Sequence, residues 1–115
     1  MIEWQQNPPK KSMNWHKAIE YAESLGEGWR LPTRAELIDA CDNKIEGFEA
    51  IYYWSSSTYA QDTNVAWSVN VYDGYVDSSD KTNSFYYVRC VRDVKGKDVD
   101  PLKLDPSCII IDRGE

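Results

Sequence analysis

A stretch of ten residues, 28–37, constrains the fold of this chain more than any other part of the sequence. It reads Gly-Trp-Arg-Leu-Pro-Thr-Arg-Ala-Glu-Leu. Pro32 fixes its own φ and disfavours helical geometry at the residue before it, so an extended segment must end there. Thr33 is a good N-cap, and Glu36 follows at the spacing of a capping box. The stretch therefore predicts an extended segment that leads directly into a helix.

Two helices are predicted around this stretch. The first begins after Asn14, which is a suitable N-cap, and ends at Gly26. Its apolar stripe consists of Trp15, Ala18, Ile19, Ala22 and Leu25. The second begins after the Thr33 cap and runs to about Asp42. Its apolar face carries Leu37, Ile38 and Cys41.

From Ile51 onward, the spacing of apolar residues changes from helical to alternating, which predicts strands. The dipeptide Asp73-Gly74 is a strong hairpin-turn signal between two of them. The predicted strands are residues 2–6, 51–56, 66–72, 75–78 and 85–92. Two helices together with antiparallel strands predict an α+β domain.

The predicted core follows from the inward sides of these elements. Along residues 66–72 apolar and polar side chains alternate, so Trp67, Val69 and Val71 face one side of the strand. Ser68, Asn70 and Tyr72 face the other side. The residues expected to be buried together are Trp29, Leu31, Trp54, Trp67, Val69 and Val88.

Size and charge exclude several classes of function. The 115 residues are enough for one domain. Proteins that bind nucleic acid need a positively charged surface, and the net charge of this chain is −6, so nucleic acid is not expected as a partner. No segment approaches the roughly 20 apolar residues of a membrane helix, and residues 1–6 lack the pattern of a signal peptide. We therefore expect a cytoplasmic or virion-associated protein with no membrane partner.

The cysteines and the single histidine indicate no metal or cofactor. Cys41, Cys90 and Cys108 form an odd, sparse set, which without a signal peptide is typical of free thiols. Cys41 and Cys90 both point toward the core, and we expect them to be reduced. No Cys-x-x-Cys pair or Cys/His cluster is present, so a zinc site is not expected.

The surface chemistry is concentrated in residues 52–87, which hold seven of the eight tyrosines and seven serines. Tyrosine, serine and asparagine are the residues that binding loops favour. The same residues also suit exposed strands and polar loops, so an ordinary sheet surface is the alternative. The predicted ligand-binding residues are Tyr59, Asp62, Asn64, Ser68, Asn70, Tyr72, Tyr75 and Asp77. Among them, the three tyrosines would be the aromatic anchors.

Residues 94–115 are predicted to be a linker followed by a docking strand. The run of Cys108, Ile109, Ile110 and Ile111 is strongly β-prone, and such a run is an aggregation hazard when it is left exposed. We expect it to pair with an edge of the domain or, by preference, with a neighbouring copy. The tail therefore predicts a possible homo-oligomer.

Four motifs in order carry a resemblance to a known family. They are Trp-Arg-Leu-Pro-Thr-x-x-Glu-Leu at 29–37, Tyr-Trp-Ser-Ser-Ser at 53–57, Ala-Trp-Ser-Val at 66–69 and Val-Arg-Cys-Val-Arg at 88–92. Together they resemble the Lcl C-terminal domain family, whose members occur largely in bacterial and phage proteins. That family resembles the C-type lectin-like fold and is distantly related to the formylglycine-generating enzymes.

The resemblance implies a C-type lectin-like domain over residues 1–93, in which two helices accompany an antiparallel twisted sheet. It implies that the first and last strands pair. It also implies that residues 52–87 carry the open sheet and the loops where ligands bind.

The resemblance raises two further functions, which we rank below simple binding. Asp73, Asp77 and Asp80 are close enough in sequence to supply calcium ligands, but the Glu-Pro-Asn, Gln-Pro-Asp and Trp-Asn-Asp motifs of sugar-binding lectins are absent. A formylglycine-type oxidase would need a reactive cysteine pair, and no two cysteines are spaced for one.

These observations predict a non-enzymatic binding module of bacterial or phage type. We expect it to recognise a protein or cell-surface ligand through a face rich in tyrosine, serine and asparagine. The alternative is a phage- or prophage-encoded inhibitor of a host protein, which would act as an acidic decoy.

Overall fold

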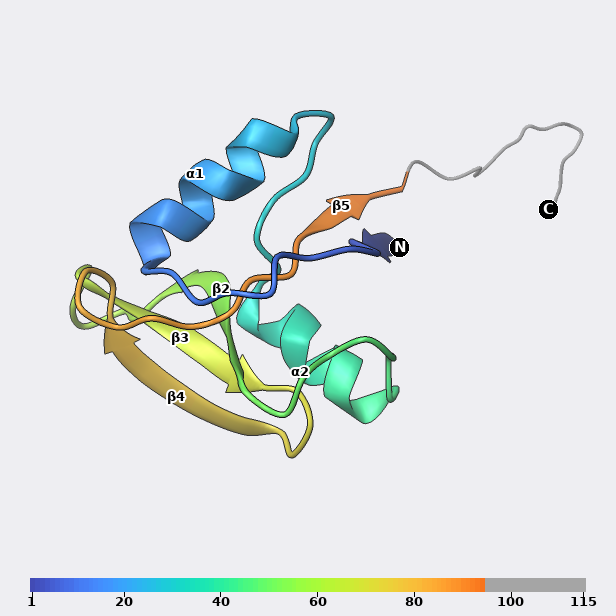
Figure 1. The fold of residues 1–115 in the computed structure, drawn as a ribbon. Helices are drawn as coiled ribbons and strands as arrows, with labels where there is room; N and C mark the ends of the chain where they lie inside the picture. The colour runs from blue at the N-terminus through green and yellow to red at the C-terminus, as the bar shows by residue number, and fades with distance from the viewer. Residues whose placement is uncertain (95–115) are drawn as a thin grey trace, which may run out of the picture.

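Figure 1 shows the fold in a computed structural model, which describes residues 1–94. The elements are β1 (Ile2–Trp4), α1 (Trp15–Leu25), α2 (Arg34–Asp42), β2 (Tyr52–Thr58), β3 (Val65–Asn70), β4 (Tyr75–Asp80) and β5 (Val91–Asp93). Two helices and two antiparallel sheets confirm the predicted α+β class. Neither of these helices is long and apolar enough to span a membrane.

The predicted tail falls almost entirely outside the described residues. Its docking strand, with Cys108, Ile109, Ile110 and Ile111, lies beyond them, and so does its linker apart from Val94. The oligomer expected from this strand therefore stays a prediction.

The strands form two separate sheets. β2, β3 and β4 make one antiparallel sheet in that order, and β1 pairs with β5 in the other. Ile2 lies opposite Asp93, so the expected pairing of the first and last strands is confirmed, and in Figure 1 the N-terminus lies beside β5. Arg92 supports this pair from the side, because its Nε donates to Glu3 Oε1 at 2.8 Å.

The stretch of residues 28–37 takes the predicted form. Thr33 Oγ1 accepts from Glu36 N at 3.1 Å, and the Glu36 carboxylate accepts from Thr33 N at 2.8 Å. Arg30 donates to both oxygens of the same carboxylate at 2.9 Å and also reaches Asp93 at 3.1 Å. The hydrogen bond from Arg30 is the main reason why the pKa of Glu36 lies below its usual value. Through Glu36 and Arg30, the start of α2 is thereby joined to the extended segment and to β5.

The prediction of one long strand over residues 85–92 is wrong. β5 covers only Val91–Asp93, and before it Tyr86 and Tyr87 make single bridges to Met13 and Tyr53. The segment crosses from the three-stranded sheet to the two-stranded one, so it changes partner every few residues. A pattern of alternating residues cannot distinguish such a crossing from one continuous strand.

The core is divided into two clusters. One lies between α1 and the face of the three-stranded sheet that carries Trp54 and Ala66, which we call the first face. The other lies between α2 and the opposite, second face, which carries Tyr53 and Val69. The first cluster contains Ala18, Ala22, Leu31, Trp54, Ala66, Val88 and Cys90. The second contains Leu37, Ala40, Tyr53, Val69 and Val71. β3 contributes to both, because successive residues of a strand point to opposite faces.

Four of the six predicted core residues are buried, and two are not. Trp29 and Trp67 are only half-buried. Each indole has a guanidinium over its ring, Arg92 at 4.8 Å from Trp29 and Arg34 at 4.5 Å from Trp67. The prediction that all six residues are buried together is therefore wrong for two reasons. These two rings complete the edges of the core rather than its centre, and Val69 belongs to the second cluster while Leu31, Trp54 and Val88 belong to the first.

Candidate functional site

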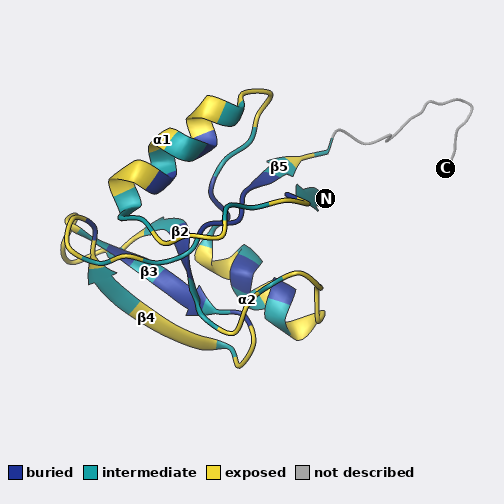
Figure 2. Cartoon of the chain, viewed as in Figure 1, coloured by how far each residue is buried: buried dark blue, intermediate teal, exposed yellow. Residues whose placement is uncertain are grey.

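The candidate site lies on the first face of the three-stranded sheet, at the end that α1 leaves open. Tyr52, Asn70 and Tyr75 lie directly opposite one another on β2, β3 and β4. Residues paired in this way point to the same face of a sheet. Tyr75 is 68% exposed, and Figure 2 shows that much of β4 is exposed as well. The three side chains therefore form a row that is partly buried at Tyr52 and Asn70 and open to solvent at Tyr75.

Tyr86 crosses this face from β2 to β4. Its ring centre lies 5.8 Å from that of Tyr52 and 4.8 Å from that of Trp54, and its hydroxyl is 2.7 Å from Ser79 Oγ. Phe85 precedes it in the chain and is 59% exposed. Together with Tyr52 and Asn70, these two residues line a shallow hollow of about 360 Å³.

Asp77 adds a carboxylate to the same face, because it lies two residues after Tyr75 on β4. Its Oδ1 accepts from Ser78 N at 2.9 Å, and the residue is exposed. The pKa of Tyr52 is raised, first by desolvation and then by the carboxylates of Asp77 and Asp73. From here on, the aromatic face means Tyr52, Asn70, Tyr75, Asp77, Phe85 and Tyr86.

Asn70 provides the neutral polar group of the aromatic face. Its Oδ1 accepts from Tyr72 N at 3.0 Å, while its Nδ2 donates to no protein group within residues 1–94. The face thus offers aromatic rings, a carboxylate and a free amide donor. Such groups can hold a ligand by contact and by hydrogen bonds.

The structure brings together three of the eight predicted ligand-binding residues. These three are Asn70, Tyr75 and Asp77 on the aromatic face. Asp62 and Asn64 lie in the loop between β2 and β3, where Asn64 N donates to Asp62 Oδ1 at 2.9 Å.

The remaining predicted residues lie elsewhere. Tyr72 is 78% exposed in the turn after β3, where it lines a hollow that includes Cys41 of α2. Tyr59 packs against Trp67, with ring centres 5.2 Å apart. Ser68 is fully buried, so it cannot contact a ligand at the surface.

The burial of Ser68 has a clear cause. It lies opposite Trp54 and Asp77 in the register, at the place where Tyr86 crosses the sheet. Alternation along β3 placed Ser68 on the correct face, but this part of the face is covered by residues distant in sequence.

Sequence reasoning missed Tyr52, Phe85 and Tyr86. The density of tyrosine in residues 52–87 was a signal for the two tyrosines. Nothing in the local pattern distinguishes Phe85, because its position depends on the crossing segment that was predicted to be a continuous strand.

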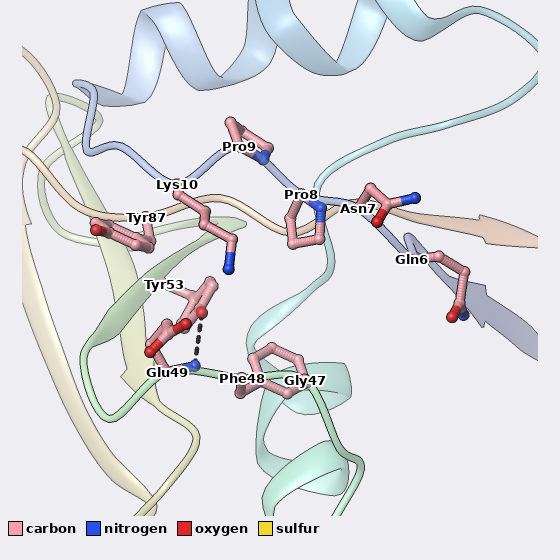
Figure 3. Close-up of a pocket in the computed structure, with 10 residues that line it drawn as sticks. All are labelled: Gln6, Asn7, Pro8, Pro9, Lys10, Gly47, Phe48, Glu49, Tyr53 and Tyr87. Carbon is pink, nitrogen blue, oxygen red and sulfur yellow. Dashed lines mark hydrogen bonds between the residues drawn. The ribbon is translucent and has the colours of Figure 1, made fainter.

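A second hollow, of about 350 Å³, lies between residues 6–10 and residues 47–49 (Figure 3). Tyr53 and Tyr87 line it, and the Tyr53 hydroxyl accepts from Glu49 N at 2.9 Å. Gly47 also lines it at a φ of +97°, and a Cβ at this position would lie 3.0 Å from Arg89 Nη1. No predicted ligand-binding residue lines this hollow.

Arg89 supports the wall of this second hollow. The side chain is 5% exposed, and its Nε and Nη1 donate to the carbonyl oxygens of Gln5 and Glu46, each at 2.8 Å. Its guanidinium lies 4.6 Å from the ring centre of Phe48. Burial lowers the pKa of Arg89. These contacts give Arg89 a structural role, which is to hold the loop of residues 46–48 in place. Because no predicted ligand-binding residue lines the second hollow, the aromatic face is the stronger candidate for a binding site.

The three aspartates considered as calcium ligands do not converge. Asp73 Oδ1 accepts from Tyr75 N, and Asp80 Oδ1 accepts from Thr82 N and Asn83 N. These backbone N–H groups are the main reason why the pKa of Asp80 is lowered. Within residues 1–94 no three acidic, histidine or cysteine side chains are grouped as metal ligands.

The two described cysteines belong to different clusters of the core, and both are free thiols. Burial raises the pKa of Cys90 to about 12, so this thiol has little thiolate character at neutral pH. Cys41 is only partly buried, which differs from its predicted place in the core.

Comparison with known proteins gives one clear result. The family model described as the Lcl C-terminal domain matches residues 1–92, which is the greater part of the chain. A search of curated proteins finds no match to this chain. The matched range thus includes all four motifs that carried the resemblance.

Proposed function

The chain belongs to the Lcl C-terminal domain family, and we propose that this member is a non-enzymatic binding module that recognises a protein or cell-surface ligand through the aromatic face. The observation that carries the proposal is the pair of large exposed side chains, Tyr75 and Phe85: Tyr75 pairs with Asn70 in the sheet, and Phe85 lines a hollow together with Asn70. The bacterial or phage origin of the protein is also a proposal, because membership of the family is its sole support.

Two physical arguments support binding at this face. Aromatic side chains are frequent hot spots in interfaces, because they bury a large area at little cost in conformational entropy. Tyr52 and Tyr86 are already held in place by their mutual contact and by the bond from Tyr86 to Ser79. A surface that is ordered before binding loses less entropy when a ligand arrives.

The second candidate is an inhibitor of a host protein that acts as an acidic decoy. The net charge of −6 and the carboxylates of Asp73 and Asp77 beside Tyr52 favour it. A decoy of this kind attracts its target through many dispersed charges, so its affinity would fall steeply with added salt. Binding that is centred on aromatic contacts would change much less.

A capture experiment tests the proposal. The full chain is immobilised, exposed to a bacterial lysate at low and at high salt, and the retained proteins are identified by mass spectrometry. The same experiment is repeated with the double variant Tyr75→Ala/Phe85→Ala and with Tyr72→Ala as a control, since Tyr72 is even more exposed but lies outside the aromatic face.

The expected result is a protein that the native chain and Tyr72→Ala retain and the double variant loses. Equal retention by the double variant would remove the aromatic face as the binding site. Loss of the captured protein at high salt, with no effect of the double variant, would favour the acidic decoy.

A further inference from the structure

The chain pairs its own cationic side chains with aromatic rings in a recurring way. In the part of the chain that the structure describes, four of them lie over a ring at a distance of 4.0 to 4.8 Å from the ring centre. The pairs are Arg34 with Trp67, Lys81 with Trp15, Arg89 with Phe48 and Arg92 with Trp29. An aromatic ring attracts a cation to its face because of its quadrupole. Three of the four cations are arginines.

The aromatic face differs from these four sites. Among residues 1–94, no lysine or arginine lies over a ring of Tyr52, Tyr75, Phe85 or Tyr86. Asp77 instead places a carboxylate on the same face, two residues after Tyr75 on β4, and the carboxylates of Asp77 and Asp73 contribute to the raised pKa of Tyr52. The face therefore has the two groups that attract a cation, aromatic rings and carboxylates, and lacks the cation.

We propose that the aromatic face receives an arginine side chain of the partner protein, with the guanidinium against an exposed aromatic ring and hydrogen-bonded to Asp77. This inference rests on the proposed function and names the chemistry of the partner at the same site. The partner is a protein with an arginine in an exposed segment.

The geometry of Asp77 suits this role. The residue is flanked on β4 by Tyr75 and by Ser79, and Ser79 bonds to the Tyr86 hydroxyl. Its carboxylate is thus bordered by two tyrosines. Among residues 1–94, the only hydrogen bond to this carboxylate is the one from Ser78 N to Oδ1, so no donor in this part of the chain occupies Oδ2.

Arginine fits better than the other charged groups. Its planar guanidinium can stack on a ring and donate to a carboxylate at the same time, which the compact ammonium of lysine does less well. An anionic ligand would meet the carboxylates of Asp73 and Asp77 and a chain of net charge −6.

Two peptides test the inference directly. Acetyl-Gly-Ser-Arg-Ser-Gly-amide and the same peptide with citrulline in place of arginine are titrated into the isotope-labelled full chain at low salt, and backbone amide shifts are followed by NMR. Citrulline keeps the shape of arginine and lacks its charge. We expect the arginine peptide to shift the amides of Asn70, Tyr75 and Tyr86 and to bind about tenfold more tightly than the citrulline peptide.

Asp77→Asn sharpens the test. Asparagine keeps an oxygen that can accept from Ser78 N, so the strand is preserved while the charge is removed. The arginine peptide should bind about threefold to fivefold more weakly to this variant, and the citrulline peptide should be unaffected. Asp42→Asn, at the end of α2 and away from the face, should change neither affinity.

The inference is overturned if the two peptides bind equally, if neither binds, or if Asp77→Asn has no effect on the arginine peptide. In those cases a lysate protein that is lost on Tyr75→Ala/Phe85→Ala would still support the proposed function. Conversely, a captured protein that the double variant retains as well as the native chain does would refute the proposed function, regardless of the peptide affinities.

Discussion

The two ends of one sheet face differ sharply although they belong to the same strands. At the closed end, Trp54 and Ala66 are fully buried under α1. At the open end, Tyr52 is partly buried and Tyr75 faces solvent. Both ends share the alternation of β2, β3 and β4, so alternation does not decide burial here. The segment that lies over each end decides it.

The largest expected effect comes from the closed end. Trp54 is fully buried, and its Nε1 donates to the Met13 carbonyl at 2.8 Å. Trp54→Ala should lower the free energy of unfolding by about 3–5 kcal/mol, as truncation of a large core side chain does. Urea unfolding of the native chain and the variant measures it. A loss below about 1 kcal/mol would mean that the closed end is not a packed core.

Trp67 lies on the other face and should have an intermediate effect. Since it is half-buried under Arg34 and beside Tyr59, Trp67→Ala removes only part of the burial that Trp54 has. We expect a loss of about 1–2 kcal/mol in the same urea experiment. The sequence predicted that Trp67 is buried in the core, and a loss as large as that of Trp54→Ala would restore that prediction.

Glu36 gives a smaller effect with a pH dependence. Its pKa is lowered in the folded chain, so its carboxylate stabilises the fold above the unfolded pKa of about 4.3. This stabilisation is lost as the pH falls through the folded value. Glu36→Gln should cost about 0.5–1 kcal/mol at neutral pH.

Thermal unfolding from neutral to acid pH checks the Glu36 prediction. The native chain should lose its advantage over Glu36→Gln as the pH falls below about 4. Curves that stay parallel throughout would show that the ion pair with Arg30 contributes nothing to stability.

The smallest effect on stability belongs to the open end. Tyr75→Ala and Phe85→Ala should each change the free energy of unfolding by no more than about 0.5 kcal/mol, because both side chains are largely exposed. The same two changes should abolish capture of the partner. If they destabilise the fold as much as Trp67→Ala, these rings are part of the core and the comparison of the two ends fails.

Local signals in the sequence predicted the local structure well. The Asn14 cap, the Thr33 and Glu36 capping box and the Asp73-Gly74 turn all lie where they were expected. Each depends on residues within a few positions of one another. The pairing of β1 with β5 followed from the family resemblance rather than from any local pattern.

The site was predicted only in part, and the reason is physical. Asn70, Tyr75 and Asp77, which the structure brings together, were predicted because residue types and strand direction indicated a polar face rich in tyrosine. Ser68 was expected at the surface although it is buried, and Phe85 was missed, because both depend on how the segment around Tyr86 crosses the sheet. Such a crossing is a tertiary contact, and no spacing of residues along one strand encodes it. The C-type lectin-like character of the domain likewise stays a prediction.

The pairing of β1 with β5 has a consequence for how the chain folds. Ile2 and Asp93 pair although nearly the whole sequence of the domain lies between them. Gln5 also bonds to Cys90 through both its main chain and its side chain. Closing so long a loop costs entropy before any contact is gained, so these strands should form late. Buried Arg89 then joins both ends to the loop of residues 46–48. We expect slow, cooperative folding, in which removal of either terminal strand prevents the other from forming.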